Sequence, residues 1–232
     1  MRPCHAETLA GIPLLIAEPE PSDGPLPVVF WCHGFRADAL AHAAELEQCA
    51  ARGFLAVGID AIDHGARHSD DLAVRLEAAA GSAMNVMLDL VDRGALELPR
   101  LIDTLAATRQ IERARVSLVG ISMGAFLGYG AIASGVPLRS VVALLGSPEW
   151  PDVRSPHRAI DAFRDVSLLS ITAEHDTHVP PGPANRLHVD LALRFPMGRH
   201  RYHELRGAGH LTSGDQWREA MAQTMAWLVQ TG

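Results

Sequence analysis

The most apolar positions of the chain fall in short continuous runs, separated by polar stretches that contain glycine or proline. The clearest runs cover residues 28–32, 54–59, 116–119, 141–145 and 166–171. Runs of this length between turn residues are typical of strands that are buried on both faces of a sheet. Shorter runs at 14–16 and 202–205 predict two further strands.

Between these runs, apolar residues recur at the three- and four-residue spacing of amphipathic helices. Such stretches cover residues 38–52, 84–91, 98–105, 126–133, 183–195 and 217–228. Asp38 is the expected N-cap of the first of these helices, and Gly53 is its expected terminator. Strands that alternate with helices predict an α/β fold, in which helices cover both faces of a mostly parallel sheet.

No change of composition along the chain suggests a domain boundary, so we expect a single domain over residues 1–232. Residues 69–95 fit the alternation least well, and we expect them to form a small helical lid over the strand ends. Residues 148–163 are a second candidate for the rim of the site. Neither segment is long enough for a large cap domain, which indicates an open site and small substrates.

The overall composition argues against several classes of protein. A formal net charge of -7 is unfavourable for binding nucleic acid, because that binding depends on neutralising phosphates. All 20 basic residues are arginine, which excludes chemistry that needs a lysine. Residues 1–7 are polar, and no apolar run approaches the roughly 18 residues that span a bilayer. We therefore expect a cytoplasmic protein without a membrane partner.

The segment from Gly120 to Gly124 has the sequence Gly-Ile-Ser-Met-Gly and lies between a predicted strand and a predicted helix. This G-x-S-x-G pattern in this context indicates a nucleophile elbow. The turn must be tight enough to project the Ser122 hydroxyl clear of the sheet, so small residues are needed two positions before and two positions after it. Ser122 is therefore the predicted nucleophile.

A serine hydroxyl needs a general base, which in this arrangement follows later in the chain, after an acid. Asp176 follows the predicted strand at 166–171, and His210 lies between the last predicted strand and the last predicted helix. We expect Asp176 to orient the imidazole of His210 and His210 to take the proton of Ser122. Glu174 is an alternative to Asp176, since it is only two residues away.

Two backbone N–H groups are expected to stabilise the developing oxyanion. One belongs to Met123, the residue after the nucleophile, and the other to the loop after the first core strand. That loop is His33-Gly34-Phe35, and we expect the Phe35 N–H to point into the site, with Gly34 as the alternative donor.

Other polar residues near the strand ends are expected to be structural. Asp60, Asp63 and His64 form a predicted hydrogen-bonded turn, because buried polar groups usually serve structure. His175 and His178 flank Asp176 without a third ligand at metal-binding spacing, so no metal site is expected. Cys32 lies within a strand and is expected to be buried and inert. Apolar residues that could line an acyl pocket, or equally belong to the core, are Met84, Met87, Phe126 and Trp150.

These motifs occur in a fixed order from the His33-Gly34-Phe35 loop to His210. In this order they resemble small bacterial carboxylesterases of the dienelactone hydrolase-like and prolyl oligopeptidase-like branch of the α/β-hydrolases. The resemblance spans about residues 28–230. It implies ester hydrolysis through an acyl-enzyme, without a cofactor. Dienelactone hydrolase itself has a cysteine nucleophile where this chain has Ser122, and the oligopeptidases carry a propeller domain for which this chain has no room.

The expected activity is therefore hydrolysis of a small-molecule ester by a Ser-His-Asp triad. A thioesterase or a small amidase would use the same residues and differ only in pocket shape. A non-catalytic ligand-binding protein with a hydrolase fold is a third possibility, although it would be free to lose a member of the triad. The sequence leaves the natural substrate open, and the lack of a sustained heptad pattern favours a monomer.

Overall fold

The computed structural model of the chain describes residues 3–21, 24–79 and 82–232. In this part of the chain, eight strands form one sheet in the order β1-β2-β4-β3-β5-β6-β7-β8. The strands are β1 (His5–Leu9), β2 (Ile12–Ala17), β3 (Leu26–Cys32), β4 (Leu55–Ile59), β5 (Ile111–Ile121), β6 (Ser140–Leu144), β7 (Ser167–Ala173) and β8 (His200–Leu205). β2 pairs in antiparallel fashion with β1 and β4, and all other pairs are parallel.

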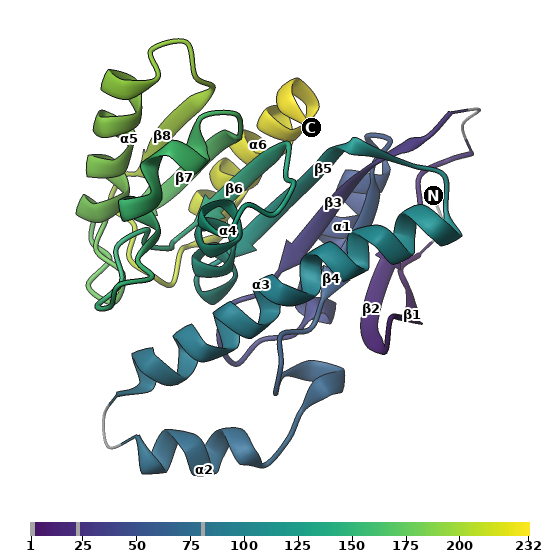
Figure 1. Cartoon of the computed structure of the whole chain (residues 1–232), viewed down its shortest axis with the longest axis horizontal. Coiled ribbons are helices and arrows are strands. Elements are labelled where there is room, and N and C mark those ends of the chain that lie inside the picture. Colours follow the sequence, from purple (N-terminus) through teal and green to yellow (C-terminus); the bar gives the residue numbers. More distant parts are fainter. Residues whose placement is uncertain (1–2, 22–23, 80–81) are drawn as a thin grey trace.

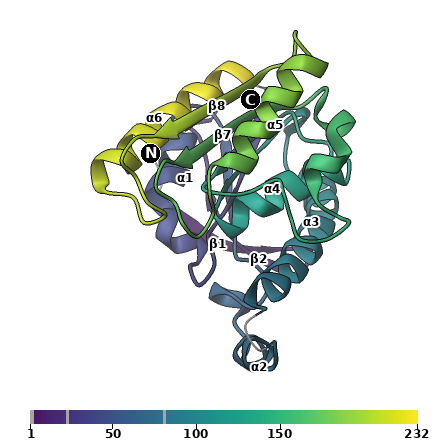
Figure 2. The ribbon, with the colours of Figure 1, turned by 90° about the vertical axis from the view of Figure 1, so that its left-hand side faces the viewer.

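Helices cover both faces of this sheet, as the alternating pattern predicts (Figures 1 and 2). One face carries α1 (Ala43–Ala50) and α6 (Gly214–Thr231), and the other carries α3 (Ala83–Thr108), α4 (Met123–Ala133) and α5 (Gly182–Arg194). Three short 3-10 helices lie at Ala39–His42, Gly65–Arg67 and Pro156–Phe163. The α/β fold class predicted from the sequence is confirmed.

The central strands are buried on both sides because neighbouring residues supply opposite halves of the core. Phe30 belongs to the apolar cluster under α3, α4 and α5, whereas Trp31 belongs to the cluster under α1 and α6. Leu118 and Val119 likewise belong to the first and the second of these clusters, respectively. This alternation follows from the two-residue repeat of a strand and explains the continuous apolar runs in the sequence.

Two predicted local features are present at the first helix of the core. The predicted helix at 38–52 consists of a 3-10 turn followed by α1, and Asp38 Oδ1 accepts a hydrogen bond from Ala41 N at 3.0 Å. Gly53 has φ +89°, the left-handed conformation that glycine adopts freely after a helix. The chain therefore turns directly into β4.

The segment between β4 and β5 differs in part from the expectation. The two predicted helices at 84–91 and 98–105 form one continuous helix, α3, which passes through Pro99. Before it lies α2 (Asp71–Ala78), which projects away from the sheet below the strand ends (Figures 1 and 2). Residues 80 and 81 of the predicted lid lie outside the described residues. None of the helices described combines the length and apolar character needed to cross a bilayer.

Parallel pairing brings the carboxyl ends of the core strands to one edge of the sheet. Cys32 lies beside both Ile59 and Gly120, and Ile121 lies beside Leu144. The loops that follow β3, β4, β5, β6 and β7 therefore start close together. In open α/β sheets this edge is where ligands bind.

Candidate active site

Ser122 lies at the sharp turn between β5 and α4. Its backbone has φ 51° and ψ −113°, a conformation that is rare for a residue with a side chain. The Ser122 N–H donates to the carbonyl of Leu144 at 2.8 Å, and the Ser122 carbonyl accepts from Ala125 N at 2.8 Å. These bonds anchor the turn to β6 on one side and to α4 on the other.

Glycine is required on both sides of this turn because backbone segments approach closely. A Cβ at Gly120 would overlap the backbone of Gly124, and a Cβ at Gly124 would overlap the carbonyl of Cys32. The spacing of the two glycines around Ser122 thus has the steric cause expected from the sequence.

The structure brings the three predicted site residues together from the ends of β5, β7 and β8. Ser122 Oγ lies 3.1 Å from His210 Nε2, and His210 Nδ1 lies 2.7 Å from Asp176 Oδ2. Both contacts are within hydrogen-bond distance. The Asp176 side chain is fully buried, whereas the His210 side chain is 20% exposed. A buried carboxylate therefore holds one side of an imidazole whose other side faces the serine.

The Asp176 carboxylate is itself held by the loop that follows it. Asp176 Oδ1 accepts hydrogen bonds from the backbone N–H groups of His178 at 2.9 Å and Val179 at 2.8 Å. Glu174, the alternative acid, turns away and accepts from Gly207 N at 2.8 Å. The geometry therefore favours Asp176 over Glu174 as the partner of His210.

The His33-Gly34-Phe35 loop lies beside the serine. A Cβ at Gly34 would lie 3.5 Å from Ser122 Cβ, which is ordinary van der Waals contact, so the loop passes directly beside the serine. His33 Nδ1 lies 2.7 Å from the carbonyl oxygen of Gly34, which directs the peptide between Gly34 and Phe35. Since the C=O and N–H of a trans peptide point in opposite directions, the Phe35 N–H points away from the His33 ring.

The second predicted donor, Met123, is the first residue of α4. Its N–H has no carbonyl one turn earlier in the helix to bind, and it lies where the positive end of the helix dipole favours negative charge. In the described part of the chain, no hydrogen bond joins the N–H of Phe35 to another residue. Among the described residues, neither N–H group thus has a hydrogen-bond partner, as an oxyanion donor requires.

His33 is a positioning residue that the sequence did not single out. Its ring is buried, and its Nε2 accepts a hydrogen bond from Ala61 N at 2.9 Å. Burial lowers the pKa of His33, and accepting that bond requires Nε2 to be unprotonated. The neutral ring therefore links the loop after β3 to the loop after β4. The His-Gly pair directly after an apolar strand is the signal that could have indicated this role.

The turn after β4 has the internal hydrogen bonds expected of a structural element. Asp60 accepts from Ala39 N and from Ala66 N, each at 2.7 Å. A Cβ at Gly65 would overlap the Asp60 carboxylate, so glycine is required there as well. The His64 ring packs edge-on against Phe35, with 5.2 Å between the ring centroids. This turn supports the loop that carries the Phe35 N–H.

The remaining candidates lie as follows. Burial raises the pKa of the Cys32 thiol to about 12, so it stays protonated and is a poor nucleophile. Phe126 and Trp150 are buried and stack at 6.3 Å, whereas Met84 is 40% exposed. Met87 is partly buried against the core. Within the ranges 3–21, 24–79 and 82–232, no cluster of three potential metal ligands was found.

Comparisons with known proteins agree with this architecture. No family model matches the chain. The esterase YjfP of Escherichia coli (strain K12) is 31% identical over 144 residues, which are 62% of this chain and 55% of that protein. The chain thus spans about half the length of the curated relatives it matches.

Many solved structures match nearly the whole chain. TT1662 from Thermus thermophilus superposes with a TM-score of 0.74 at 24% identity, covering 98% of this chain and 99% of that one. The dienelactone hydrolase-like promiscuous phosphotriesterase P91 from metagenomic libraries superposes with a TM-score of 0.71 at 16% identity, covering all of both chains. The chain therefore has the α/β-hydrolase fold, and the resemblance noted from its motifs is confirmed.

Proposed function

We propose that the chain is a serine hydrolase that cleaves carboxylic esters of small or short-chain substrates. The observation that carries the proposal is the continuous hydrogen-bonded line from Ser122 Oγ through the His210 imidazole to the buried Asp176 carboxylate. The esterase name of the E. coli relative supports the same class of reaction.

In the proposed first half-reaction, Ser122 Oγ attacks the ester carbonyl carbon while His210 Nε2 takes the hydroxyl proton. Asp176 stabilises the imidazolium that forms, through the bond at Nδ1. The tetrahedral intermediate collapses as the bond between the acyl carbon and the leaving oxygen breaks. His210 returns the proton to that oxygen, so the alcohol leaves and an acyl ester on Ser122 remains.

In the second half-reaction, a water molecule takes the place of the alcohol. His210 Nε2 accepts a proton from it, and the hydroxide attacks the acyl carbon. The bond to Ser122 Oγ breaks, His210 returns the proton to Oγ, and the carboxylic acid leaves. Apart from this water molecule, no group outside the chain and the substrate is needed for the balance of these steps.

The backbone N–H groups of Phe35 and Met123 are the proposed oxyanion hole in both half-reactions. The loop that contains Gly34 and Phe35 passes beside Ser122 on one side, and the start of α4 supplies the other donor. Donors of this kind act because they are fixed before the charge develops, and removal of one typically lowers kcat by about 100- to 1000-fold.

We propose that the residues and elements around this open site limit the size of the substrate. Leu211, directly after His210, is 94% exposed, so the rim beside the base is open to solvent. We propose α2, within the predicted lid at residues 69–95, as the element that covers the strand ends when substrate is bound. We also propose that residues 1–232 form a single domain.

The test is hydrolysis of p-nitrophenyl esters by the wild type and Ser122→Ala, with Ser134→Ala as the matched control. Ser134 lies directly after α4, at the far end of the same helix. We expect Ser122→Ala to lose about 10⁴-fold or more in kcat, and Ser134→Ala to keep the wild-type rate. Equal activity in all three proteins would exclude Ser122 as the nucleophile.

An organophosphorus probe separates the ester proposal from its alternatives. Covalent labelling of Ser122 without turnover of oxygen esters would direct the assay to thioesters and amides, which need the same nucleophile. Absence of both labelling and turnover would support a ligand-binding protein with a hydrolase fold.

A further inference from the structure

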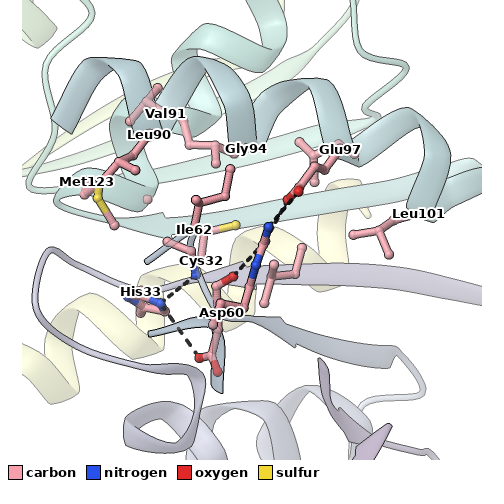
Figure 3. Close-up of a pocket in the computed structure, with 16 residues that line it drawn as sticks. Cys32, His33, Asp60, Ile62, Leu90, Val91, Gly94, Glu97, Leu101 and Met123 are labelled. Atoms are coloured by element: carbon pink, nitrogen blue, oxygen red, sulfur yellow. Dashed lines mark hydrogen bonds and ion pairs between the residues drawn. The ribbon is translucent and has the colours of Figure 1, made fainter. Parts of the chain in front are cut away.

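An internal cavity lies behind the first turn of α4, between α3 and the carboxyl ends of β3 and β4 (Figure 3). Its free volume is about 20 Å³, which is room for about one water molecule or methyl group. Met123 and Gly124 form the wall nearest to Ser122. The cavity thus begins directly behind one of the two proposed oxyanion donors.

The cavity lies along α3. Its α3 wall is one face of that helix, from Leu90 through Gly94 to Leu101. At 1.5 Å per residue this face extends over about 16 Å. The free space beside this face holds only about one methyl group, so it fits the end of a short alkyl chain better than a ring.

The lining offers no free charge to a ligand. It is mainly aliphatic, and two of its three charged side chains, Arg67 and Glu97, form a bidentate pair with both distances 2.7 Å. The third, Asp60, accepts from the backbone N–H groups of Ala39 and Ala66. Arg67 also donates to the carbonyl of Asp60 at 3.2 Å. Because these groups already satisfy one another, the space favours an apolar occupant.

We propose that this cavity receives the alkyl end of a short acyl group, and that Leu90 and Gly94 set the length of that group. The proposal rests on the esterase function proposed above. An oxyanion held by the N–H of Met123 places the acyl carbon beside that residue. The unbranched Met123 side chain adapts its shape easily, so it can move aside and admit the chain.

Leu90 and Gly94 act on the cavity in opposite directions. Leu90 is buried, so its truncation to alanine would enlarge the space. A Cβ at Gly94 would lie 2.8 Å from Leu127 Cδ1, across the gap between α3 and α4. Gly94→Ala therefore adds a methyl group to the lining of the cavity and forces the flexible end of Leu127 to shift, which reduces the space.

The experiment compares kcat/KM for p-nitrophenyl esters from acetate to octanoate. We expect Leu90→Ala to move the optimum of kcat/KM to acyl chains at least two carbons longer. Each methylene that gains burial should raise kcat/KM about fourfold. Gly94→Ala should move it toward acetate. The matched control is Leu105→Ala, which truncates a buried leucine of the same helix outside the cavity and should keep the wild-type profile.

A second measurement does not need catalysis. Calorimetry on Ser122→Ala, alone and combined with each variant, measures the binding of the free acids from acetate to octanoate. If no ester is hydrolysed but Leu90→Ala strengthens octanoate binding relative to Leu105→Ala, the esterase proposal fails and the cavity proposal stands. If esters are hydrolysed but neither the kcat/KM profile nor the binding profile changes in Leu90→Ala and Gly94→Ala, the cavity proposal is wrong. If Leu90→Ala does not fold, Gly94→Ala alone tests the cavity proposal.

Discussion

At the scale of single residues, the site depends on one strained backbone. Ser122 has positive φ although it carries a side chain, a conformation that typically costs about 1–3 kcal/mol. The flanking glycines make this turn possible, because any Cβ at either position would meet backbone atoms rather than movable side chains. The packing of β3, β5 and α4 therefore maintains the exposure of the nucleophile.

Gly124→Ala tests this dependence. Its Cβ would overlap the Cys32 carbonyl, so we expect α4 to shift and the free energy of unfolding to fall by about 3 kcal/mol, with loss of activity. Gly128→Ala in the same helix meets only side-chain atoms of Val141 and Leu118, at 3.0 and 3.1 Å, and should cost less. Urea unfolding measures both, and equal effects would contradict the steric argument.

The assignment of the acid is also decided at single residues. Asp176→Asn removes the charge that stabilises protonated His210 and allows the wrong tautomer, so we expect kcat to fall by about 10⁴-fold. Glu174→Gln is the control, because that side chain binds the N–H of Gly207 instead. Ester hydrolysis by both variants checks the assignment, and a larger loss in Glu174→Gln would reverse it.

At the scale of elements, strands buried on both faces were predictable because their apolar runs are continuous. The run at 28–32 corresponds to β3 (Leu26–Cys32) within two residues. By contrast, no apolar run marks β1 (His5–Leu9), since it is an edge strand that pairs with β2 and is largely exposed. Its mixed polar sequence carries no sign of burial.

The continuity of α3 was missed for a different reason. The two apolar faces at 84–91 and 98–105 are separated in the sequence, and proline inside a helix normally ends or kinks it, yet α3 passes through Pro99. In the structure the buried face continues across it, with Val91, Ala95, Leu98 and Ile102 in contact with the core at the three- and four-residue spacing. The burial of this face stabilises the helix despite the missing hydrogen bond.

The same distinction applies to the site. The nucleophile elbow was visible in the sequence because five consecutive residues form it. The cavity behind Met123 was not, because Cys32, Ala61, Leu90 and Leu127 come from four separate elements or loops. No local pattern joins these positions, and only the packing of α3 on the sheet brings them together.

The position of α2 gives an element-scale prediction. Arg75 on α2 pairs with Asp63 at 3.1 Å and with Asp89 on α3 at 2.5 Å, so it links the helix to both neighbours. We expect Arg75→Gln to loosen α2 by about 1 kcal/mol and to speed amide hydrogen exchange over 71–78 about fivefold. Arg93→Gln is the control, since Arg93 pairs with Asp89 within α3 at 3.8 Å. Equal exchange in both variants would mean that apolar packing alone holds α2.

At the scale of the whole molecule, stability in acid depends on histidines that are buried in the neutral form. His188 on α5 lies with its Nε2 2.8 Å from Ser170 Oγ of β7, and Ser170 in turn lies 2.7 Å from the hydroxyl of Tyr129 on α4. Burial lowers the pKa of His188 to about 3, and burial also lowers the pKa of His33. These two side chains lie in different parts of the structure, so their protonation affects the whole fold.

The direction of the effect follows from where the protons bind. In the unfolded chain a histidine titrates near pH 6.5, whereas folded His188 stays neutral down to about pH 3. Below pH 6.5 the unfolded state therefore binds more protons, and the free energy of unfolding falls as the pH falls. The contribution of His188 is fully present above pH 6.5 and is lost progressively between pH 6.5 and about 3.

His188→Gln removes this titration and can keep a polar contact to Ser170. We expect the variant to lose stability less steeply than the wild type between pH 6 and 5, by up to about 1.4 kcal/mol per pH unit. That window lies above the usual range of carboxylates, so histidines dominate it. His68→Gln, at a side chain that is 71% exposed, is the control. Urea unfolding at several pH values gives the slopes, and an unchanged slope in His188→Gln would show that His188 is already protonated in the folded protein.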